Sequence, residues 1–318
     1  MMTDQQLTQR LEAVNWKDLE HVRQAAKQDP EVFKFIYQKV EEQNDRDVET
    51  MARSITDPTM AKIFGDLRRD GVAVWPGLYN DPQFLESARK FVKEVTADVK
   101  ASISSRKDSQ VVKNGYLYGV SEPVEKPANL GVPVYGRTRA QWSSRDMANG
   151  HPTMKVVAQD PRIMSILGAY SGRPPAEILV IAEELVPSFA GQEWHLDKWY
   201  EQIKAMILLT DCTMKNGPLR LVKGSHRNRS KRIWKMMHDC YAFDPSYCCT
   251  SDTAIEEDKC EVFWGTGKAG DCILFDATTL HAGTRCMEGE RLDYVYYAIS
   301  DSLKSQTLLA MLGTGGKS

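Results

Sequence analysis

Apolar positions in the first 70 residues repeat at helical spacing. Leu7, Leu11 and Val14 lie three or four positions apart, and the same spacing continues amid Glu, Lys, Gln and Arg. A stripe of this kind is typical of amphipathic helices. Pro30 and Pro58 indicate helix starts or breaks, because proline is tolerated mainly in the first turn of a helix. The pattern predicts an N-terminal helical layer that packs against the rest of the chain.

The period of the pattern changes after residue 70. The segment GVAVWPGLYND, residues 71–81, contains a short β-type run that ends at Pro76-Gly77, a dipeptide typical of turns. A further helix is predicted from Pro82 to about Ser104, because apolar side chains again recur every three or four positions. The expected buried face of this helix comprises Phe84, Leu85, Ala88, Phe91 and Val92.

Beyond residue 175 the chain contains short runs rich in Val, Ile, Leu and aromatic residues, bounded by Gly, Pro, Asp or Asn. Such runs are typical of strands. One helix is predicted among them, at about residues 227–240. Helices followed by many antiparallel strands predict an α+β fold whose core is a β-sandwich or barrel. The predicted strands are residues 177–186, 203–212, 219–224, 271–276 and 291–300.

The chain shows no sign of division into domains. It has no internal repeat, low-complexity tract or linker, and its content of 42% hydrophobic and 26% charged residues is that of a globular protein. We therefore expect residues 1–318 to form a single domain, in which residues 1–70 are a helical extension. Residues 71–318 would form the core with its flanking helices.

The charge of the chain is balanced, with 41 basic against 43 acidic residues. This balance argues against a nucleic-acid or anionic-membrane partner. The basic run KGSHRNRSKR, residues 223–232, lacks interleaved aromatic residues and is interpreted as a solvated helix start. No apolar stretch approaches the ~20 residues that span a bilayer. The polar first six residues predict no secretory signal.

The cysteines indicate a reducing compartment. There are seven, an odd number, and no CxxC pair is present. The group Cys240, Cys248, Cys249 and Cys260 has a spacing that fits none of the usual zinc sites. We interpret the cysteines as mostly reduced thiols and expect a cytoplasmic protein.

The segment QEWHLDKWYEQ, residues 192–202, contains a candidate metal site. In an extended segment His195 and Asp197 point the same way and can meet one ion. Taken alone, the pair is also explained as a hydrogen-bonded His-Asp pair at a strand end. His281, which follows the predicted strand 271–276, adds a second imidazole. Two histidines and one carboxylate can occupy one face of an octahedral Fe(II) and leave three positions open, whereas structural zinc closes its shell.

Arg291 is a candidate for binding a co-substrate at such a metal. A bidentate 2-oxo acid would fill two open positions and dioxygen the third, and its far carboxylate needs a cation that arginine supplies better than lysine. Ten residues after His281, one hairpin places Arg291 beside the metal. The alternative is a solvated arginine at a strand end, and Arg285 is a nearer but less well placed competitor.

Four stretches of the chain resemble the phytanoyl-CoA dioxygenase-like family of Fe(II)/2-oxoglutarate-dependent oxygenases. They are WHLDKWY, ILLTDCTMKNGPLRLVKGSHR, GDCILFDATTLHAG and RLDYVYYA, in the family's order. GVAVWPGLYND is similar to the family's N-terminal strand. The resemblance implies a double-stranded β-helix (jelly-roll, cupin-like) core flanked by helices. Residues 1–70 are a longer helical preface than the family needs, and residues 228–265 match nothing that we can assign.

The resemblance also implies roles for individual residues. His195, Asp197 and His281 would bind the iron, and Arg291 would bind the C5 carboxylate of 2-oxoglutarate. Related halogenases carry a small residue in the place of Asp197, so its presence favours hydroxylase-type chemistry.

The implied reaction oxidises an unactivated C–H bond. Fe(II), 2-oxoglutarate and O2 are the implied cofactor and co-substrates, and succinate and CO2 are released. The outcome would be hydroxylation, or radical desaturation or oxidative cyclisation. Two other classes fit similar residues: a jelly-roll metalloenzyme that does not use 2-oxoglutarate, and a non-catalytic binding protein with a vestigial site. In a metalloenzyme that does not use 2-oxoglutarate, Arg291 would have no role. The intact triad argues against a non-catalytic binding protein.

Cationic and aromatic residues near the site indicate an anionic substrate. Lys198 and Tyr200 directly follow the metal ligands, and Arg139 and Trp142 are expected in a loop before the core. Cations with aromatic side chains suit a small molecule that carries a carboxylate or phosphate, such as an amino-acid-derived metabolite. The alternative for each is a solvated side chain or, for Trp142, a position in the core. The oligomeric state has no signal in the sequence.

Overall fold

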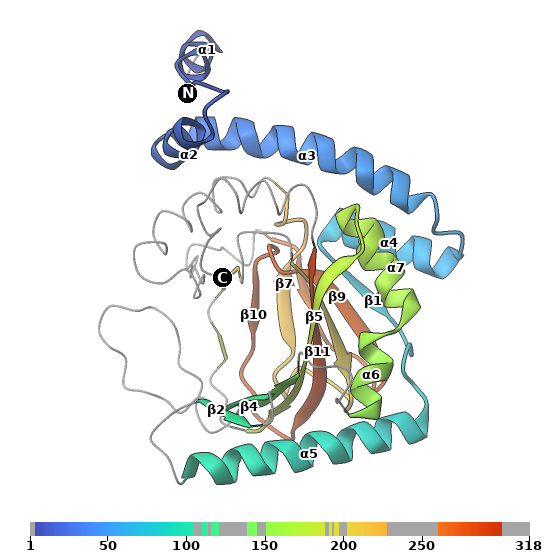
Figure 1. Cartoon of the computed structure of the whole chain (residues 1–318). Coiled ribbons are helices and arrows are strands. Elements are labelled where there is room, and N and C mark those ends of the chain that lie inside the picture. Colours follow the sequence, from blue (N-terminus) through green and yellow to red (C-terminus); the bar gives the residue numbers. More distant parts are fainter. Residues whose placement is uncertain are drawn as a thin grey trace.

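The computed structural model describes residues 4–104, 110–113, 116–120, 139–144, 151–187, 191–192, 194–196, 202–227 and 260–300. Helices occupy mainly the first half of these residues, and strands the second (Figure 1). The helices are α1 (Asp4–Glu12), α2 (Leu19–Gln28), α3 (Pro30–Ala52), α4 (Pro58–Asp70), α5 (Pro82–Ser104), α6 (Pro152–Ala158) and α7 (Pro161–Ser171).

The strands form two sheets, and every strand pair within them is antiparallel. The large sheet has eight strands in the order β1-β9-β6-β11-β5-β4-β3-β2, and the small sheet has three in the order β10-β7-β8. The strands are β1 (Val72–Trp75), β2 (Gln110–Lys113), β3 (Tyr116–Val120), β4 (Arg139–Ser144), β5 (Pro175–Leu185), β6 (Gln202–Leu208), β7 (Leu219–Val222), β8 (Val262–Trp264), β9 (Cys272–Asp276), β10 (His281–Gly283) and β11 (Arg291–Ser300). The predicted mixture of helices and antiparallel strands is confirmed.

Both prolines of the N-terminal segment start helices, as predicted. Pro30 is the first residue of α3, and the carboxylate of Asp29 accepts a hydrogen bond from the Glu31 backbone N–H at 2.9 Å. Asp57 caps α4 ahead of Pro58 in the same way. An aspartate followed by proline satisfies a free N–H and pre-sets the first helical turn. The predicted helix from Pro82 to Ser104 corresponds to α5.

Other elements differ from the prediction. Arg139 and Trp142 lie in β4 and not in a loop, because this segment pairs with β3 and β5 within a broader sheet than expected. The strand expected over residues 203–212 ends at Leu208. Arg227 lies in a turn, and the remainder of the helix predicted over residues 227–240 falls outside the described residues. The helices α6 and α7 and the strands β2, β3, β8 and β10 were not predicted.

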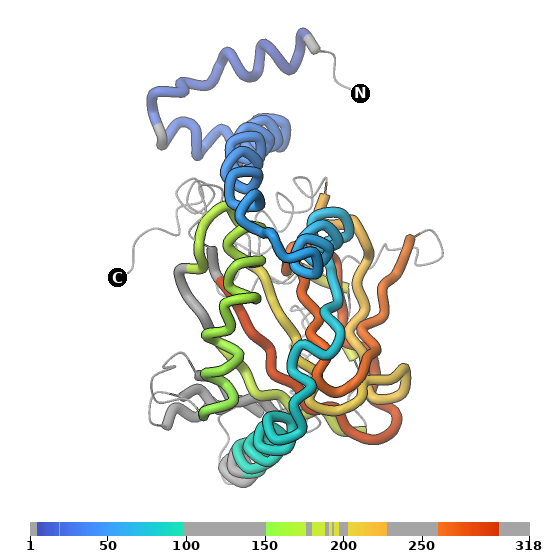
Figure 2. Tube along the Cα trace, turned by 90° about the vertical axis from the view of Figure 1, so that its right-hand side faces the viewer, coloured from blue at the N-terminus to red at the C-terminus, as the bar shows by residue number. Residues whose placement is uncertain are grey.

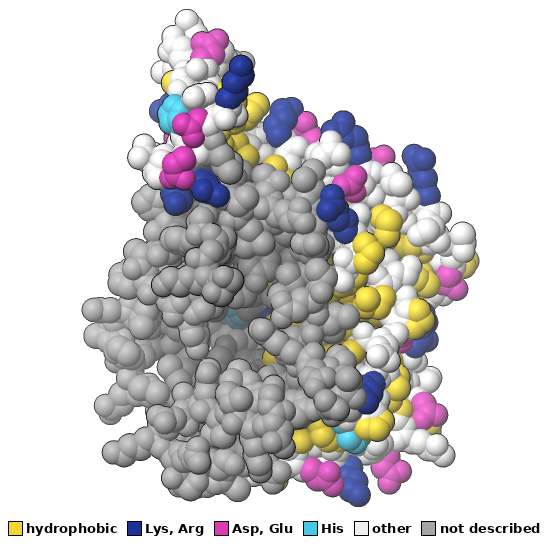
Figure 3. All heavy atoms as spheres, viewed as in Figure 1, with side chains coloured by type: hydrophobic (Ala, Val, Ile, Leu, Met, Phe, Trp, Pro, Cys, Tyr) yellow, Lys and Arg dark blue, Asp and Glu magenta, His cyan; other side chains and the backbone are white. Residues whose placement is uncertain are grey.

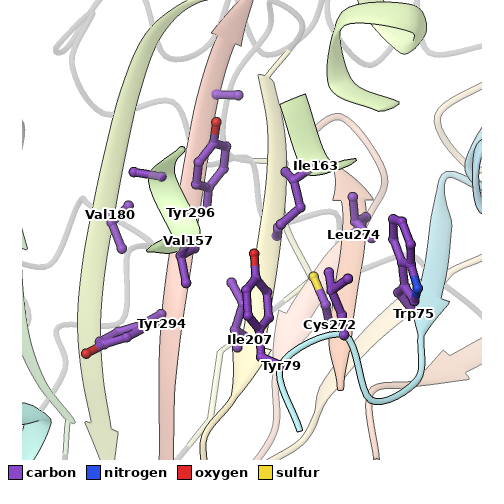
Figure 4. Packing of buried hydrophobic residues seen from close by; sticks show 14 of the residues in the cluster. Trp75, Tyr79, Val157, Ile163, Val180, Ile207, Cys272, Leu274, Tyr294 and Tyr296 are labelled. Atoms are coloured by element: carbon purple, nitrogen blue, oxygen red, sulfur yellow. The ribbon is translucent and has the colours of Figure 1, made fainter. Parts of the chain in front are cut away.

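The outer face of the large sheet, which packs against α5, α6 and α7, carries the main apolar core. Figure 4 shows Tyr294 and Tyr296 of β11 beside Ile207, facing Val157 and Ile163 of the helices. Each of these side chains is buried. Burial of a large apolar side chain contributes about 1.5–3 kcal/mol to folding.

The inner face of the large sheet is the one that faces the small sheet. Met206, Leu208 and Phe275 of the large sheet form one buried cluster with Leu219 and Leu221 of the small sheet. Because side chains alternate along a strand, β6 and β9 each contribute to both this cluster and the outer core. The two sheets therefore lie face to face with side chains packed between them.

The N-terminal helices pack behind the small sheet. Figures 1 and 2 show α1, α2 and α3 at one end of the molecule, beyond the strands. Phe33 and Tyr37 of α3 belong to a buried cluster that also contains Trp194, Leu196 and Ala282. The predicted helical layer therefore packs on the segment that contains His195. Among the described residues, no helix is long and apolar enough to cross a membrane.

Candidate metal centre

His195 and His281 lie side by side. Each backbone N–H donates to the carbonyl of the other, at 2.9 and 3.0 Å, so the two residues form a short antiparallel bridge. Their ring centroids are 4.5 Å apart with an interplanar angle of 49°. Both side chains are buried, at 7% and 3% exposure. Figure 3 shows the surface of the molecule from the side of Figure 1, with histidine side chains in cyan.

A tight turn fixes the orientation of the His281 ring. The His281 Nδ1 lies 2.8 Å from the Thr279 carbonyl oxygen and donates to it, which leaves Nε2 available as a metal ligand. The carboxylate of Asp276 holds the turn, because it accepts hydrogen bonds from the N–H and hydroxyl of Thr278 at 2.8 and 2.6 Å. The hydroxyl of Tyr170 donates to the same carboxylate at 2.8 Å. This buried network sets the ring before any ion binds.

The separation of the two rings fits a shared ion. Two imidazoles that bind one ion at right angles, with metal–nitrogen distances of about 2.1 Å, have ring centroids about 4.7 Å apart. The observed 4.5 Å agrees with this value. The predicted third ligand, Asp197, lies outside the described residues, as do Lys198 and Tyr200. The described part of the chain contains no group of three or more His, Cys, Asp or Glu that could hold a metal, so the complete triad stays a prediction.

The segment that contains His195 is fixed on both sides. The backbone N–H of Gln192 donates to the Gly283 carbonyl at 2.7 Å, and the Gly283 N–H donates to the Gln192 side-chain oxygen at 3.0 Å. On the side that faces the N-terminal helices, the Arg220 guanidinium lies 4.4 Å from the centroid of the Trp194 ring. Sequence reasoning did not identify these supports, because they depend on contacts between segments far apart in the chain.

Arg291 is buried at the start of β11, with 3% exposure. Its guanidinium donates to the carboxylates of Asp293 at 2.8 Å and Glu183 at 3.0 Å, and to the Gly217 carbonyl. Burial alone would lower the pKa of Arg291, but the charges of Asp293 and Glu183 raise it above its ordinary value. The arginine is therefore a permanent cation bonded to two carboxylates.

Lys204 of β6 is a second buried cation that sequence reasoning missed, with 6% exposure. Its ammonium lies 4.3 Å from the centroid of the Tyr297 ring and 5.8 Å from that of Phe275. The Phe275 ring is in turn 5.2 Å from that of His281. The available signal was a lysine inside the apolar run IKAMILL, at a position where alternation predicts burial.

The structure places the backbone of the predicted substrate residues Arg139 and Trp142 in β4. Arg139 and Arg291 both pair with Leu185, one from each side of β5, and Trp142 pairs with Ala182. The two arginines therefore stand at the same level of the large sheet, on the strands that flank β5.

Comparison with known proteins identifies relatives for most of the chain. The family model described as Phytanoyl-CoA dioxygenase (PhyH) matches residues 67–287. An ectoine dioxygenase from Bordetella parapertussis is 28% identical over 149 residues, which cover 41% of this chain and 47% of that relative. The matched part thus spans about half the length of this curated relative.

Solved structures show the same fold. The non-heme alpha ketoglutarate dependent epimerase SnoN from nogalamycin biosynthesis has a TM-score of 0.50 and 18% sequence identity, with 82% of this chain and 91% of that chain covered. The non-heme alpha ketoglutarate dependent carbocyclase SnoK from the same biosynthesis has a TM-score of 0.50 and 16% identity, with 79% and 86% covered. At these identities the likeness concerns the fold alone.

Proposed function

Because this chain belongs to the phytanoyl-CoA dioxygenase family, we propose that it is an Fe(II)- and 2-oxoglutarate-dependent oxygenase. The observation that carries the proposal is the buried pair His195 and His281, whose ring separation and fixed His281 tautomer suit one shared ion. Asp197, two positions after His195, would complete two histidines and one carboxylate.

We propose that the two facing sheets form a double-stranded β-helix. The central strands of the large sheet follow the order β5-β11-β6-β9, and the small sheet contains β10-β7-β8, to which the His195 segment adds by its bridge to His281. Two antiparallel sheets that pack face to face in this way support the jelly-roll arrangement. We also propose that residues 1–318 act as one domain, with the N-terminal helices as a support for the His195 segment.

Each residue of the proposed site would have its own binding role. His195, Asp197 and His281 hold Fe(II), and Arg291 binds the C5 carboxylate of 2-oxoglutarate while it shares its guanidinium with Glu183 and Asp293. When bound, the iron and 2-oxoglutarate supply the oxidising chemistry with O2, and release succinate and CO2. The protein positions the reactants and excludes water.

The substrate would be a small molecule that carries a carboxylate or phosphate. The ectoine dioxygenases among the relatives support a small-molecule substrate. Lys198, Tyr200, Arg139 and Trp142 are the proposed substrate-binding residues. The presence of Asp197 favours hydroxylation, desaturation or cyclisation over halogenation. We propose no nucleic-acid or membrane partner, and a cytoplasmic protein whose described cysteines are free thiols.

The decisive experiment is succinate formation from 2-oxoglutarate in the presence of Fe(II), O2 and a panel of small acids that includes ectoine. We expect His195→Ala to abolish this reaction. His21→Ala is the matched control, because His21 lies in α2, where its ring accepts a hydrogen bond from the nearby Asn15 N–H. Retention of full activity in His195→Ala would refute the iron site.

The same preparation separates the alternative classes. Turnover of a substrate without 2-oxoglutarate would indicate a metalloenzyme of another type. Failure of the wild-type protein to retain Fe(II) or a surrogate metal would indicate a binding protein with a vestigial site. Product mass then distinguishes an added oxygen atom from the loss of two hydrogens.

A further inference from the structure

Lys204 projects from the inner face of the large sheet. Its neighbours Ile203 and Ala205 belong to the outer core, whereas Met206 belongs to the cluster between the sheets. Because side chains alternate along a strand, Lys204 shares the inner face with Met206. A lysine at such a position is uncommon, since burial of an ammonium group is costly.

Two aromatic rings hold the Lys204 ammonium. Tyr297 of β11 and Phe275 of β9 are its register partners on the two flanking strands. The ammonium lies 4.3 Å from the Tyr297 centroid and 5.8 Å from the Phe275 centroid, which are cation–π distances. The strand register therefore fixes where this charge stands.

This charge stands at the metal end of the inner face. The Phe275 ring is 5.2 Å from the His281 ring, so one phenyl group contacts both the lysine and a candidate metal ligand. Arg291 lies six positions before Tyr297 on β11, which corresponds to about 20 Å along an extended strand. Lys204 and Arg291 thus occupy opposite ends of the same face.

Lys204 adds a second buried cation to this face. The guanidinium of Arg291 is already bonded to the carboxylates of Glu183 and Asp293. An ammonium group at the metal end can donate charge-assisted hydrogen bonds to a carboxylate of the co-substrate.

The geometry points to Lys204 as the residue that binds the carboxylate next to the keto group of 2-oxoglutarate, the one at the iron. This inference rests on the proposed function. It extends that function by assigning a binding residue to the end of the co-substrate that lies at the metal. Arg291 retains the distal carboxylate. Lys204 is thus required for any 2-oxo acid that chelates the iron, whether or not the acid has a second carboxylate.

The test uses two 2-oxo acids and one variant. Anaerobic, Fe(II)-loaded protein is titrated with 2-oxoglutarate and with 2-oxovalerate, which has the same chain length and lacks the distal carboxylate. Binding is read from the visible absorption band of the chelated 2-oxo acid, so no turnover is needed. We expect Lys204→Met to weaken both acids by the same factor, about 10- to 100-fold, and Lys204→Arg to recover part of the loss.

The control is Lys93→Met. Lys93 lies in α5, on the outer side of the same sheet, where it pairs with Glu184 and Glu290. This variant should bind both acids as the wild type does. Lys204→Gln, whose side chain is polar, uncharged and one atom shorter than that of lysine, replaces Lys204→Met if circular dichroism shows that the methionine variant is unfolded.

Three results would overturn the inference. Wild-type affinity for both acids in a folded Lys204 variant would make Lys204 a structural residue. A loss confined to 2-oxoglutarate would assign Lys204 to the distal carboxylate instead. If the wild-type protein binds Fe(II) but gives no band with either acid, the proposed function itself fails, and the Lys204 assignment fails with it.

Discussion

The two faces of the large sheet use neighbouring glutamates in different ways. Glu184 points to the outer face, where it accepts hydrogen bonds from Lys93 at 2.8 Å and Thr96 at 2.6 Å. Glu183 points to the inner face and pairs with Arg291 at 3.0 Å. The Lys93 side chain is 41% exposed, whereas that of Arg291 is 4% exposed. One ion pair borders solvent and the other is sealed between the sheets.

The difference separates two roles of the large sheet. Its outer face packs the apolar core, and its inner face carries the charged residues of the candidate site. The outer face is otherwise apolar, as the tyrosines and aliphatic residues around Tyr294 show. The inner face contains Glu183, Asp293, Arg291 and Lys204, all buried. Buried charges of this kind are weak evidence for stability, because desolvation offsets their attraction. The charged co-substrate that we propose for the inner face would give these buried charges a role.

The largest expected effect comes from breaking the inner pair. Arg291→Met leaves Glu183 and Asp293 buried without their cation, so the free energy of unfolding should fall by about 3–5 kcal/mol. Lys93→Met breaks the outer pair, in which only the lysine borders solvent and the buried Glu184 keeps its hydrogen bond from Thr96, and should cost less, about 1–3 kcal/mol. Urea unfolding followed by circular dichroism measures both. Equal losses in the two variants would contradict the distinction between the faces.

A smaller effect is expected at the turn that orients His281. Asp276→Asn weakens the carboxylate contacts to Thr278 while it keeps the size of the side chain. We expect Fe(II) affinity to fall roughly 10-fold, as for other residues that orient metal ligands. Tyr170→Phe, which removes only the hydroxyl that donates to Asp276, is the matched comparison and should have a weaker effect. Affinity for Fe(II) is measured by competition with a metal indicator. Unchanged affinity in Asp276→Asn would show that the turn does not support the metal site.

The smallest effect concerns a charge beside the outer core. Burial alone would raise the pKa of Asp160, but hydrogen bonds from Arg162 and Tyr79 outweigh it and hold the pKa below its usual value. Asp160 therefore stabilises the fold at pH values above its unfolded pKa, and this contribution is lost as pH falls through the folded pKa. Asp160→Asn should lower stability at neutral pH by about 1 kcal/mol. The difference in stability between Asp160→Asn and the wild type should shrink below about pH 4. Thermal melts of both proteins across pH measure it. A difference that does not change with pH would argue against ionisation of Asp160 as its cause.

The sequence predicted those parts of the fold that depend on local pattern. Asp29-Pro30 and Asp57-Pro58 start helices because the cap and the ring act on adjacent residues. The extent of α5 follows from its apolar spacing. The strand β4 was missed, because RAQWSS has neither a clear alternation nor a hydrophobic run, and its place depends on pairing with β5.

The candidate site was predictable in part for the same reason. His195 and His281 were identified from their positions around strands, and the structure brings their rings together. The partners of Arg291 were not predicted, because Glu183 lies 108 positions away in the chain. Lys204 was missed because its importance depends on Phe275 and Tyr297, which only the strand register places beside it.

The most direct test of the central claim is an anaerobic titration of the Fe(II)-loaded protein with 2-oxoglutarate. We expect the wild-type protein to give a saturable visible absorption band from the chelated 2-oxo acid, and His195→Ala to give none while His21→Ala matches the wild type. A wild-type protein that retains Fe(II) and gives no band would contradict the claim that His195 and His281 form part of an iron site for 2-oxoglutarate.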